Sequence, residues 1–146
     1  MERTFIIVKP DAVTRGLVGK IVGMFEDAGL KILGMRMLHM TKAEAQGFYH
    51  VHKERPFFDS LTDFMSSAPI VAVALEGPEA ISRVREIMGA TDPKEAAEGT
   101  IRKLYALDKE KNSCHGSDSI ESMLTEVPYF FRDLDLCDYS RAATSK

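Results

Sequence analysis

Apolar runs of strand type alternate with helical apolar stripes along this chain, and that alternation restricts the possible folds most strongly. Residues 4–8 form a β-rich apolar run that stops at Lys9-Pro10-Asp11, where the proline lacks a ladder donor and starts a turn. Residues 70–76 form a second, continuous apolar run of strand length. Residues 31–40 form a weaker strand pattern, in which Leu33, Met35 and Met37 share one parity while basic side chains occur on both. These patterns predict at least three strands.

Helical apolar spacing fills the segments between these runs. Apolar side chains recur at helical spacing over residues 14–28, which predicts a first helix there. Residues 41–44, Thr-Lys-Ala-Glu, form a capping box that predicts a short helix, and a second short helix is expected after Pro56. Gly77-Pro78 opens another helix, which carries a buried apolar stripe and ends before Gly89.

The last third of the chain is less regular. Residues 90–111 lack sustained periodicity and form a long excursion, a kind of segment that is usually functional in a compact domain. A short strand near residues 111–114 would return the chain to the sheet. Asp118 and Glu121 form a second capping-box pair, which predicts a helix that ends at Pro128. The apolar stripe of that helix is expected to comprise Ile120, Met123, Leu124 and Val127.

The resulting order is strand, helix, strand, two short helices, strand, helix, excursion, strand and helix. Two split β-α-β units in one sheet account for this order. We therefore expect an α+β sandwich: a ferredoxin-like fold with an antiparallel four-stranded sheet and an inserted helical hairpin. A chain of 146 residues is close to one typical domain, so residues 1–146 are expected to form a single domain, with residues 139–146 fraying as a small, polar tail.

Charge and cysteine content argue against several classes of protein. The 19 lysines and arginines against 22 aspartates and glutamates leave a net charge of −3, which argues against binding nucleic acid by bulk electrostatics. Two cysteines cannot form a multi-bridge framework, so a reducing, cytoplasmic location is expected. The apolar residues at 5–8 are too few for a signal peptide, and the longest apolar run, at 70–75, is too short to span a membrane.

Three short motifs match common sites only in part. Residues 16–20 (Gly-Leu-Val-Gly-Lys) have two residues between the glycines where a phosphate-binding P-loop has four, and Ile21 stands in place of the required hydroxyl. The same glycines could form an RNA-clamping loop, which the acidic charge balance disfavours. His50 and His52 could bind a metal with a third ligand, but on a helix their side chains would diverge, so a solvated or capping role is favoured.

The stretch from Asn112 to Ser119 concentrates groups suited to chemistry where a short strand meets a helix. At its centre, the His115 imidazole would be about three-quarters neutral at pH 7 with an unperturbed pKa near 6.5, so it offers a free nitrogen as nucleophile or base. Gly116 allows a close turn, and the helix start presents unpaired amides to an anion. From the residues alone, a capping loop in which His115 merely packs explains the stretch equally well.

Five motifs resemble those of the nucleoside diphosphate kinases, occur in the same order and extend over nearly the whole chain. They are Lys9-Pro10-Asp11, Arg55-Pro56-Phe57-Phe58, Gly89-Ala90-Thr91-Asp92-Pro93, Gly99-Thr100-Ile101-Arg102 and Asn112-Ser113-Cys114-His115-Gly116-Ser117-Asp118-Ser119. The resemblance implies an enzyme that transfers the terminal phosphoryl group of a nucleoside triphosphate to a nucleoside diphosphate and so maintains the NTP and dNTP pools. It also favours the nucleophile role for His115, as a phosphohistidine in a ping-pong mechanism.

Four further residues match catalytic positions of the family. Lys9 matches a phosphate-holding residue, and Tyr49 matches one that helps to orient Lys9 and the histidine. Glu126 matches the carboxylate that bonds the histidine nitrogen not undergoing phosphorylation and so sets the tautomer and ring orientation. Ser117 is expected to bond either Glu126 or the arriving phosphate, although a serine at a helix start can also be a cap alone.

The resemblance also implies how the phosphates are held. Arg85, Arg102 and Thr91 match phosphate-binding positions, and Arg55 is expected at the rim of the site; for a single arginine, a surface salt bridge is the ordinary alternative. The sequence has no cluster of aspartates suited to an all-protein magnesium cage. Mg²⁺ is therefore expected to arrive on the nucleotide phosphates, with no metal ligand from the chain.

The nucleoside is expected at the other end of the site. Phe57 matches the aromatic that stacks on the nucleobase, with Leu61 one helical turn further on, and stacking implies low base specificity. Asn112 and Lys9 match groups that contact the sugar hydroxyls. The implied partners are nucleoside tri- and diphosphates and further copies of the chain in a homo-oligomer, a tetramer or a hexamer; no membrane or nucleic-acid partner is expected.

Two other classes of function remain open on the sequence. A binding or scaffold protein on the same fold would be expected to lack the nucleophile or one of its partner residues, and none of the matched residues is missing. A histidine phosphocarrier would take its phosphate from a protein, and the phosphate would stay on the histidine when a nucleoside diphosphate is added.

Overall fold

A four-stranded antiparallel sheet forms the centre of the molecule in the computed structural model, which describes residues 1–142. Its strands lie in the order β2-β3-β1-β4. Their bounds are Glu2–Val8 for β1, Lys31–Leu38 for β2, Ile70–Gly77 for β3 and Cys114–Gly116 for β4. β1 occupies an inner position, paired along its length with β3 and over Ile6–Val8 with β4. This arrangement confirms the predicted α+β, ferredoxin-like fold.

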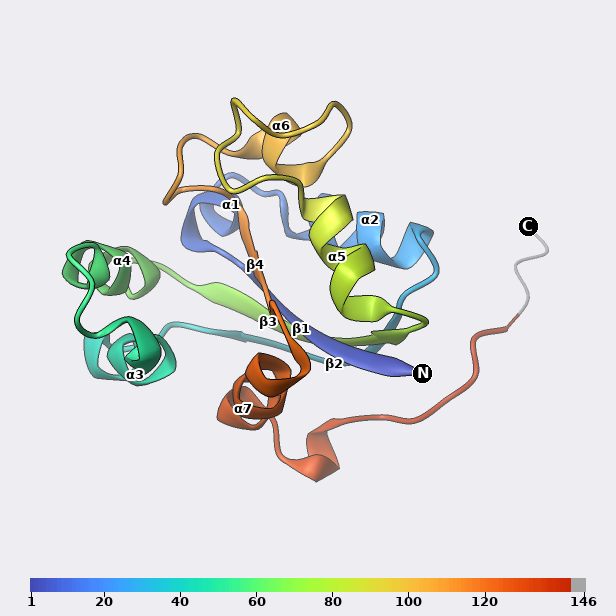
Figure 1. Cartoon of the computed structure of the whole chain (residues 1–146). Coiled ribbons are helices and arrows are strands. Elements are labelled where there is room, and N and C mark those ends of the chain that lie inside the picture. Colours follow the sequence, from blue (N-terminus) through green and yellow to red (C-terminus); the bar gives the residue numbers. More distant parts are fainter. Residues whose placement is uncertain (143–146) are drawn as a thin grey trace.

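Helices cover both faces of this sheet (Figure 1). The bounds are Pro10–Thr14 for α1, Val18–Asp27 for α2, Lys42–Phe48 for α3, Phe58–Met65 for α4, Ala80–Met88 for α5, Ile101–Tyr105 for α6 and Ile120–Phe130 for α7, with short 3-10 helices at His50–His52 and Asp133–Asp135. One face packs against α1, α2, α5 and α6, and the other against α3, α4 and α7. Within residues 1–142, no helix has the length and apolar character needed to cross a membrane.

The alternation of side chains along β1 divides the apolar core into two layers. Ile6 and Val8 belong to the layer beneath α2 and α5, whereas Phe5 and Ile7 belong to the layer beneath α3, α4 and α7. All four side chains are fully buried, and full burial of such a side chain contributes about 1.5 to 3 kcal/mol relative to leaving it exposed. The strand end that leads into Lys9 is therefore anchored on both faces of the sheet.

The helix predicted over residues 14–28 corresponds to α2, which begins later, at Val18, and a separate short helix that was not predicted, α1, precedes it. Pro10 occupies the first turn of α1, where a helix needs no N–H donor, so the Lys9-Pro10-Asp11 motif starts a helix rather than a simple turn. Gly16 then adopts a φ of +72° and separates α1 from α2. The apolar periodicity was a true sign of burial, because Leu17 and Ile21 both lie in the core.

Two other helix predictions are confirmed. At the start of α3, the Thr41 side chain accepts a hydrogen bond from the Glu44 amide, and the Glu44 carboxylate accepts one from the Thr41 amide, which is the predicted capping box. α5 ends at Gly89, which has a φ of +87°. A positive φ strains any residue with a side chain, so the glycine allows the chain to leave the helix towards residues 90–100.

Helix α7 departs from the prediction at both ends. Its N-cap is Ser119, whose side chain accepts from the Ser122 amide, so Asp118 and Glu121 do not form a capping box. The helix also continues through Pro128, because the ladder resumes with the Phe131 amide donating to the Val127 carbonyl at 2.9 Å. Packing of Val127 and Phe130 in the core stabilises this last turn.

The predicted apolar stripe of α7 is only half correct. Val127 is buried and Met123 packs against the core, but Ile120 and Leu124 are 51% and 61% exposed. The helix turns Glu126 towards the sheet edge, as described below, and this orientation carries Ile120 and Leu124 out to the surface. Apolar spacing alone did not show which of two neighbouring faces would be buried.

The short fourth strand is shifted along the chain. β4 covers Cys114–Gly116 rather than residues 111–114, because residues 107–111 close into a turn. In that turn the Leu107 amide donates to the Lys111 carbonyl at 2.8 Å. The shift places His115 within the strand, opposite Ile7 of β1.

The C-terminal segment follows the edge of the sheet as far as the structure describes it. The Tyr139 hydroxyl donates to the carbonyl of Ile32, and Arg141 Nη1 donates to the carbonyl of Glu26 at 3.1 Å. The predicted frayed tail, residues 139–146, includes residues 143–146, which lie outside the described residues.

Candidate active site

One cavity of about 820 Å³ gathers most of the candidate residues. It is lined by ten of them: Lys9, Tyr49, Phe57, Leu61, Arg85, Thr91, Arg102, Asn112, His115 and Glu126. They come from parts of the chain that are far apart in the sequence, which the sheet and its covering helices bring together. Ser117 is fully buried beside this cavity, and Arg55 is exposed and lies outside its lining.

His115 is presented by a rigid piece of backbone. The preceding Ser113 has a φ of +76°, and its carbonyl accepts a 2.9 Å hydrogen bond from the Lys9 amide at the end of β1. The following Gly116 packs so closely on α5 that a Cβ there would lie 2.8 Å from the Met88 sulfur. The histidine therefore sits between two positions that allow little movement of its backbone.

The His115 imidazole is held by a carboxylate. Nε2 lies 3.1 Å from Oε1 of Glu126, and the same oxygen accepts a 2.6 Å hydrogen bond from the Ser117 hydroxyl. The side chains of His115 and Glu126 are 20% and 17% exposed, so the pair is mostly shielded from water. An ionised carboxylate can only accept, so Nε2 carries the proton, and in the neutral tautomer of the ring Nδ1 keeps a free lone pair.

Aromatic rings pack edge-on around this imidazole. The ring centroids of Phe48, Tyr49 and Phe5 lie 5.5, 6.1 and 6.2 Å from that of His115, each at a steep interplanar angle. Edge-to-face packing of this kind is favourable and resists rotation of the ring. The hydrogen bond to Glu126 and these contacts together fix the direction of Nδ1.

Lys9 is a buried cation in the same cavity. Only 6% of the residue is exposed, and Nζ donates to the Glu110 carbonyl at 3.5 Å. Burial, with a smaller contribution from the positive charge of Arg102, lowers the pKa of Lys9 to about 8. An anionic ligand beside this ammonium group would replace lost hydration and favour its charged form.

Arg102 is fixed by backbone carbonyls. Nη1 donates to the Gly89 carbonyl at 3.0 Å and Nη2 to the Cys114 carbonyl at 2.9 Å, so the guanidinium joins the end of α5 to β4. Burial lowers its pKa, although an arginine remains protonated throughout the physiological range. Its Nε atom has no hydrogen-bond partner within residues 1–142 and remains available to a ligand oxygen.

Tyr49 takes part in the site differently from the expectation. Its hydroxyl is buried and has no hydrogen-bond partner in the described part of the chain, so it bonds neither Lys9 nor His115. Burial raises the pKa of this phenol, which keeps it a neutral donor. Its observed contact with the histidine is the edge-on packing of the two rings.

Two apolar side chains of the cavity lining come from the start of α4. Phe57 caps the start of α4 and is 44% exposed, and Leu61 lies one turn further along the same helix. The His52 ring lies 5.6 Å from the Phe57 ring. A half-exposed phenylalanine at the mouth of a cavity presents an open face on which a planar ring can stack.

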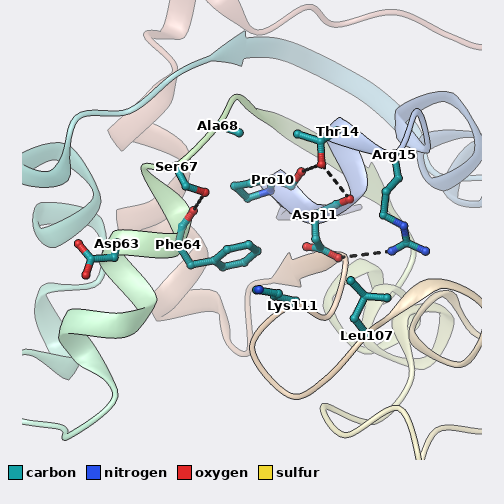
Figure 2. A pocket seen from close by; sticks show the side chains of 10 residues that line it. All are labelled: Pro10, Asp11, Thr14, Arg15, Asp63, Phe64, Ser67, Ala68, Leu107 and Lys111. Carbon is teal, nitrogen blue, oxygen red and sulfur yellow. Dashed lines mark hydrogen bonds and ion pairs between the residues drawn. The ribbon is translucent and has the colours of Figure 1, made fainter.

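Asp11 supports the site from behind Lys9, where it borders a second cavity of about 510 Å³ (Figure 2). Its Oδ2 accepts from the Ser113 hydroxyl at 3.4 Å and lies 3.9 Å from Nη1 of Arg15. Burial raises the pKa of this carboxyl, and the charges of Lys9 and Arg15 oppose that rise. Among the described residues, the second cavity shares no lining residue with the first.

Comparison with known proteins agrees with this geometry. A family model described as nucleoside diphosphate kinase matches residues 2–136. The chain belongs to the nucleoside diphosphate kinase family. A nucleoside diphosphate kinase from Nitratidesulfovibrio vulgaris (strain Hildenborough) is 60% identical over 136 residues, which cover 93% of this chain and 98% of the relative. One from Desulfatibacillum aliphaticivorans is 59% identical over 93% of this chain and 99% of its own length.

Solved nucleoside diphosphate kinases also share the fold. The Aquifex aeolicus enzyme superposes with a TM-score of 0.92 at 49% identity and covers 93% of this chain and 99% of its own. The Halobacterium salinarum enzyme, solved in complex with CDP, has a TM-score of 0.92 at 44% identity and covers 96% of this chain and 93% of its own. The resemblance drawn from the motifs is thereby confirmed, and the protein is a nucleoside-diphosphate kinase, a phosphotransferase.

The cavity is also lined by residues for which the sequence suggested no contact with substrate, although Gly116 and Asp118 belong to one of the five motifs. These lining residues are Phe48, Val51, His52, Lys109, Glu110, Gly116, Asp118 and Ser122. Phe48 could have been found from its place on the apolar side of α3. Lys109 and Glu110 could not, because they belong to the aperiodic excursion and approach the site only through contacts distant in the sequence.

Proposed function

We propose that the enzyme works by a ping-pong mechanism through a phosphohistidine at His115. The observation that carries this proposal is the bond from Nε2 to Glu126, because it leaves Nδ1 unprotonated in a cavity lined by Lys9, Arg85 and Arg102. Nδ1 attacks the γ-phosphorus of a nucleoside triphosphate; the N–P bond forms while the bond to the β,γ-bridging oxygen breaks. The nucleoside diphosphate leaves with that electron pair, and a second nucleoside diphosphate reverses the step.

Glu126 and Ser117 have the task of holding the imidazole through both half-reactions. The ring gains positive charge as the N–P bond forms, and the carboxylate 3.1 Å from Nε2 offsets that charge. The Ser117 hydroxyl holds the accepting oxygen of Glu126 in place at 2.6 Å. Phosphoryl transfer needs little more from a protein than alignment and electrostatic stabilisation.

The phosphates are assigned to the basic end of the cavity. Lys9, Arg85 and Arg102 would neutralise the charge on the transferring group, and the Thr91 hydroxyl would add a donor. Tyr49 is proposed to use its unpaired hydroxyl there, with a phosphate or a water as its acceptor. Arg55 would act only at the rim, because it is exposed and outside the lining.

The nucleoside is assigned to the other end. Phe57 would stack on the base and Leu61 would cover its edge, while Asn112 and Lys9 would contact the sugar hydroxyls. Stacking contributes about 1 to 3 kcal/mol per base and depends little on base identity, so low base specificity is proposed. The complex of the Halobacterium salinarum relative with CDP supports nucleotide binding on this fold.

Mg²⁺ is proposed to enter as part of the substrate. Within residues 1–142, no group of three or more His, Cys, Asp or Glu side chains is placed to hold a metal ion. The hard cation would therefore be held by phosphate oxygens and water. When bound in this way it would neutralise part of the phosphate charge, in addition to the basic side chains.

A housekeeping role completes the proposal. As a single domain acting on nucleoside tri- and diphosphates, the enzyme would maintain the NTP and dNTP pools, without nucleic-acid or membrane partners. A cytoplasmic location is supported by Cys114 and Cys137, which are both free thiols. Assembly as a homo-oligomer, a tetramer or a hexamer, is proposed from the family resemblance.

Labelling with γ-labelled ATP tests the mechanism. Purified enzyme should take up label in the absence of acceptor and release it to any added nucleoside diphosphate, whereas His115→Ala should take up none while binding nucleotide nearly normally. Label that remained on the protein after acceptor was added would instead indicate a phosphocarrier. Turnover by His115→Ala would show that His115 is not the nucleophile.

A further inference from the structure

Residues 107–112 form a turn at the edge of the cavity, and two of its side chains contact separate parts of the chain. Lys109 Nζ lies 3.9 Å from Oδ2 of Asp92, in the loop after α5. The Glu110 carboxylate accepts from the Ser60 hydroxyl on α4, with oxygen–oxygen distances of 3.1 and 3.0 Å. Both Lys109 and Glu110 line the cavity, so the turn forms part of the binding site.

The turn holds Glu110 in a defined direction. Oδ1 of Asp108 accepts hydrogen bonds from the amides of Glu110 and Lys111 at 2.9 and 2.7 Å. The amide nitrogen of the Asn112 side chain donates to the Lys109 carbonyl at 2.9 Å. The Glu110 carbonyl accepts from Lys9 Nζ while its side chain contacts α4, so backbone and side chain meet the site on two sides.

Ser60 places that carboxylate beside the proposed stacking surface. It lies three residues after Phe57 and directly before Leu61 on the same short helix. Its hydroxyl has a single proton and so donates to only one carboxylate oxygen at a time. An ionised carboxylate offers roughly four lone-pair sites, so Glu110 keeps acceptor capacity towards the cavity.

A carboxylate at the edge of a base distinguishes bases by their hydrogen-bonding groups. It accepts from an exocyclic amino group, as acidic side chains do from cytosine N4. A carbonyl at the same position carries its own lone pairs and is repelled. Cytosine and uracil have the same ring size, so they stack with nearly equal energy. They differ in the exocyclic group, an amino group in cytosine and a carbonyl in uracil, so a carboxylate at that edge distinguishes them.

We propose that Glu110 is a specificity-determining residue that accepts a hydrogen bond from the base and favours amino-bearing pyrimidines, CDP over UDP. The inference rests on the proposed function, which places the base against Phe57. Glu110 adds a bias to the generally low base specificity of stacking. A hydrogen bond to a charged group at a partly open site gives a preference of about threefold to tenfold.

The ratio of kcat/KM for CDP to that for UDP, with ATP as donor, tests the proposal. The wild-type ratio should lie at about three to ten and fall towards one in Glu110→Gln. Glu54→Gln is the matched control, because Glu54 is exposed between α3 and α4 and lies outside the cavity lining. It removes the same charge and should leave the wild-type ratio unchanged.

Calorimetric dissociation constants for CDP and UDP measure the same ratio without turnover. A wild-type ratio near one, an unchanged ratio in Glu110→Gln or an equal change in Glu54→Gln would overturn the role of Glu110. Wild-type protein that bound both nucleotides and showed the preference without transferring phosphate would contradict the proposed mechanism instead. The two failures are therefore distinguishable.

Discussion

The Nε2 atom of His115 lies 3.1 Å from Oε1 of Glu126, across eleven residues of sequence and the start of α7. This contact decides which nitrogen of the ring is free. With its proton directed at the carboxylate, Nε2 is not available for attack, and Nδ1 is the nitrogen left for the proposed attack on phosphorus. The buried Ser117 hydroxyl binds the same oxygen and makes the arrangement stiff.

Replacing Glu126 by glutamine keeps the shape of this contact and removes its charge. The amide cannot offset the positive charge that forms on the ring, so Glu126→Gln should lower the rate of enzyme phosphorylation by about a hundredfold or more. Single-turnover kinetics would measure this rate. The nucleotide affinity of Glu126→Gln should stay near that of the wild type. Glu121→Gln, a matched change at an exposed position of α7, should leave the phosphorylation rate near that of the wild type. An unchanged rate would show that the carboxylate is not needed.

The lowered pKa of Lys9 predicts a pH dependence with a definite sign. The pKa of about 8 means that free enzyme loses the ammonium charge as pH rises through this value, so kcat/KM should fall above pH 8. Bound phosphates favour the charged form, so kcat should fall only at higher pH. Lys9→Arg should keep the positive charge at high pH and so abolish the fall in kcat/KM. If kcat/KM fell equally in wild type and variant, the fall would belong to another group.

The same shift affects folding. In the unfolded chain Lys9 titrates near the ordinary lysine pKa of about 10.5, so between about pH 8 and 10.5 the unfolded state binds more protons than the native state. This residue therefore makes the free energy of unfolding rise with pH across that interval. Lys9→Met should remove this part of the rise in urea unfolding curves, and an identical pH dependence in wild type and variant would contradict the burial of a charged Lys9.

Local signals in the sequence predicted most of the fold, because they act over a few residues. The capping box at Thr41 and Glu44, the glycine that ends α5 and the apolar strands all depend on their neighbours in sequence. Pro128 was wrongly expected to end α7, because core contacts of Val127 and Phe130 outweigh the lost donor. Such tertiary contacts leave no trace in a local pattern.

The candidate site was predictable mainly from the family resemblance and not from local patterns in the sequence. The family resemblance pointed to ten residues that line the cavity, whereas the residues around His115 alone left its role undecided. Glu110 escaped detection because its contact with Ser60 joins residues fifty positions apart. Arg55 matches a motif but is exposed outside the lining, so a motif match did not by itself place a side chain in the cavity.

Removing the Phe57 ring tests the proposed base site. Phe57→Ala should weaken the binding of ADP, GDP, CDP and UDP by about 1 to 3 kcal/mol each, since every base has a face that can stack. Calorimetry of the four nucleotides would measure these losses. A loss confined to purines or to pyrimidines would contradict stacking as the main contact.

Gly89 is expected to be essential for stability. It has a φ of +87° and a ψ of 178°, and a Cβ there would lie 2.5 Å from the Thr100 hydroxyl oxygen. Gly89→Ala should lower the free energy of unfolding by about 1 to 3 kcal/mol. Gly23→Ala, in α2 with open space around it, should instead raise it by about 0.5 to 1 kcal/mol. Urea unfolding would compare them, and equal effects would refute the backbone argument.

The identity of the phosphorylated atom tests the account most directly. Enzyme with ¹⁵N-labelled histidine can be phosphorylated by ATP without acceptor and studied by phosphorus–nitrogen correlation NMR. The Glu126 contact predicts one N–P coupling, to Nδ1 of His115, which disappears when a nucleoside diphosphate is added. Coupling to Nε2, or a phosphate on any other residue, would contradict the proposed geometry of attack.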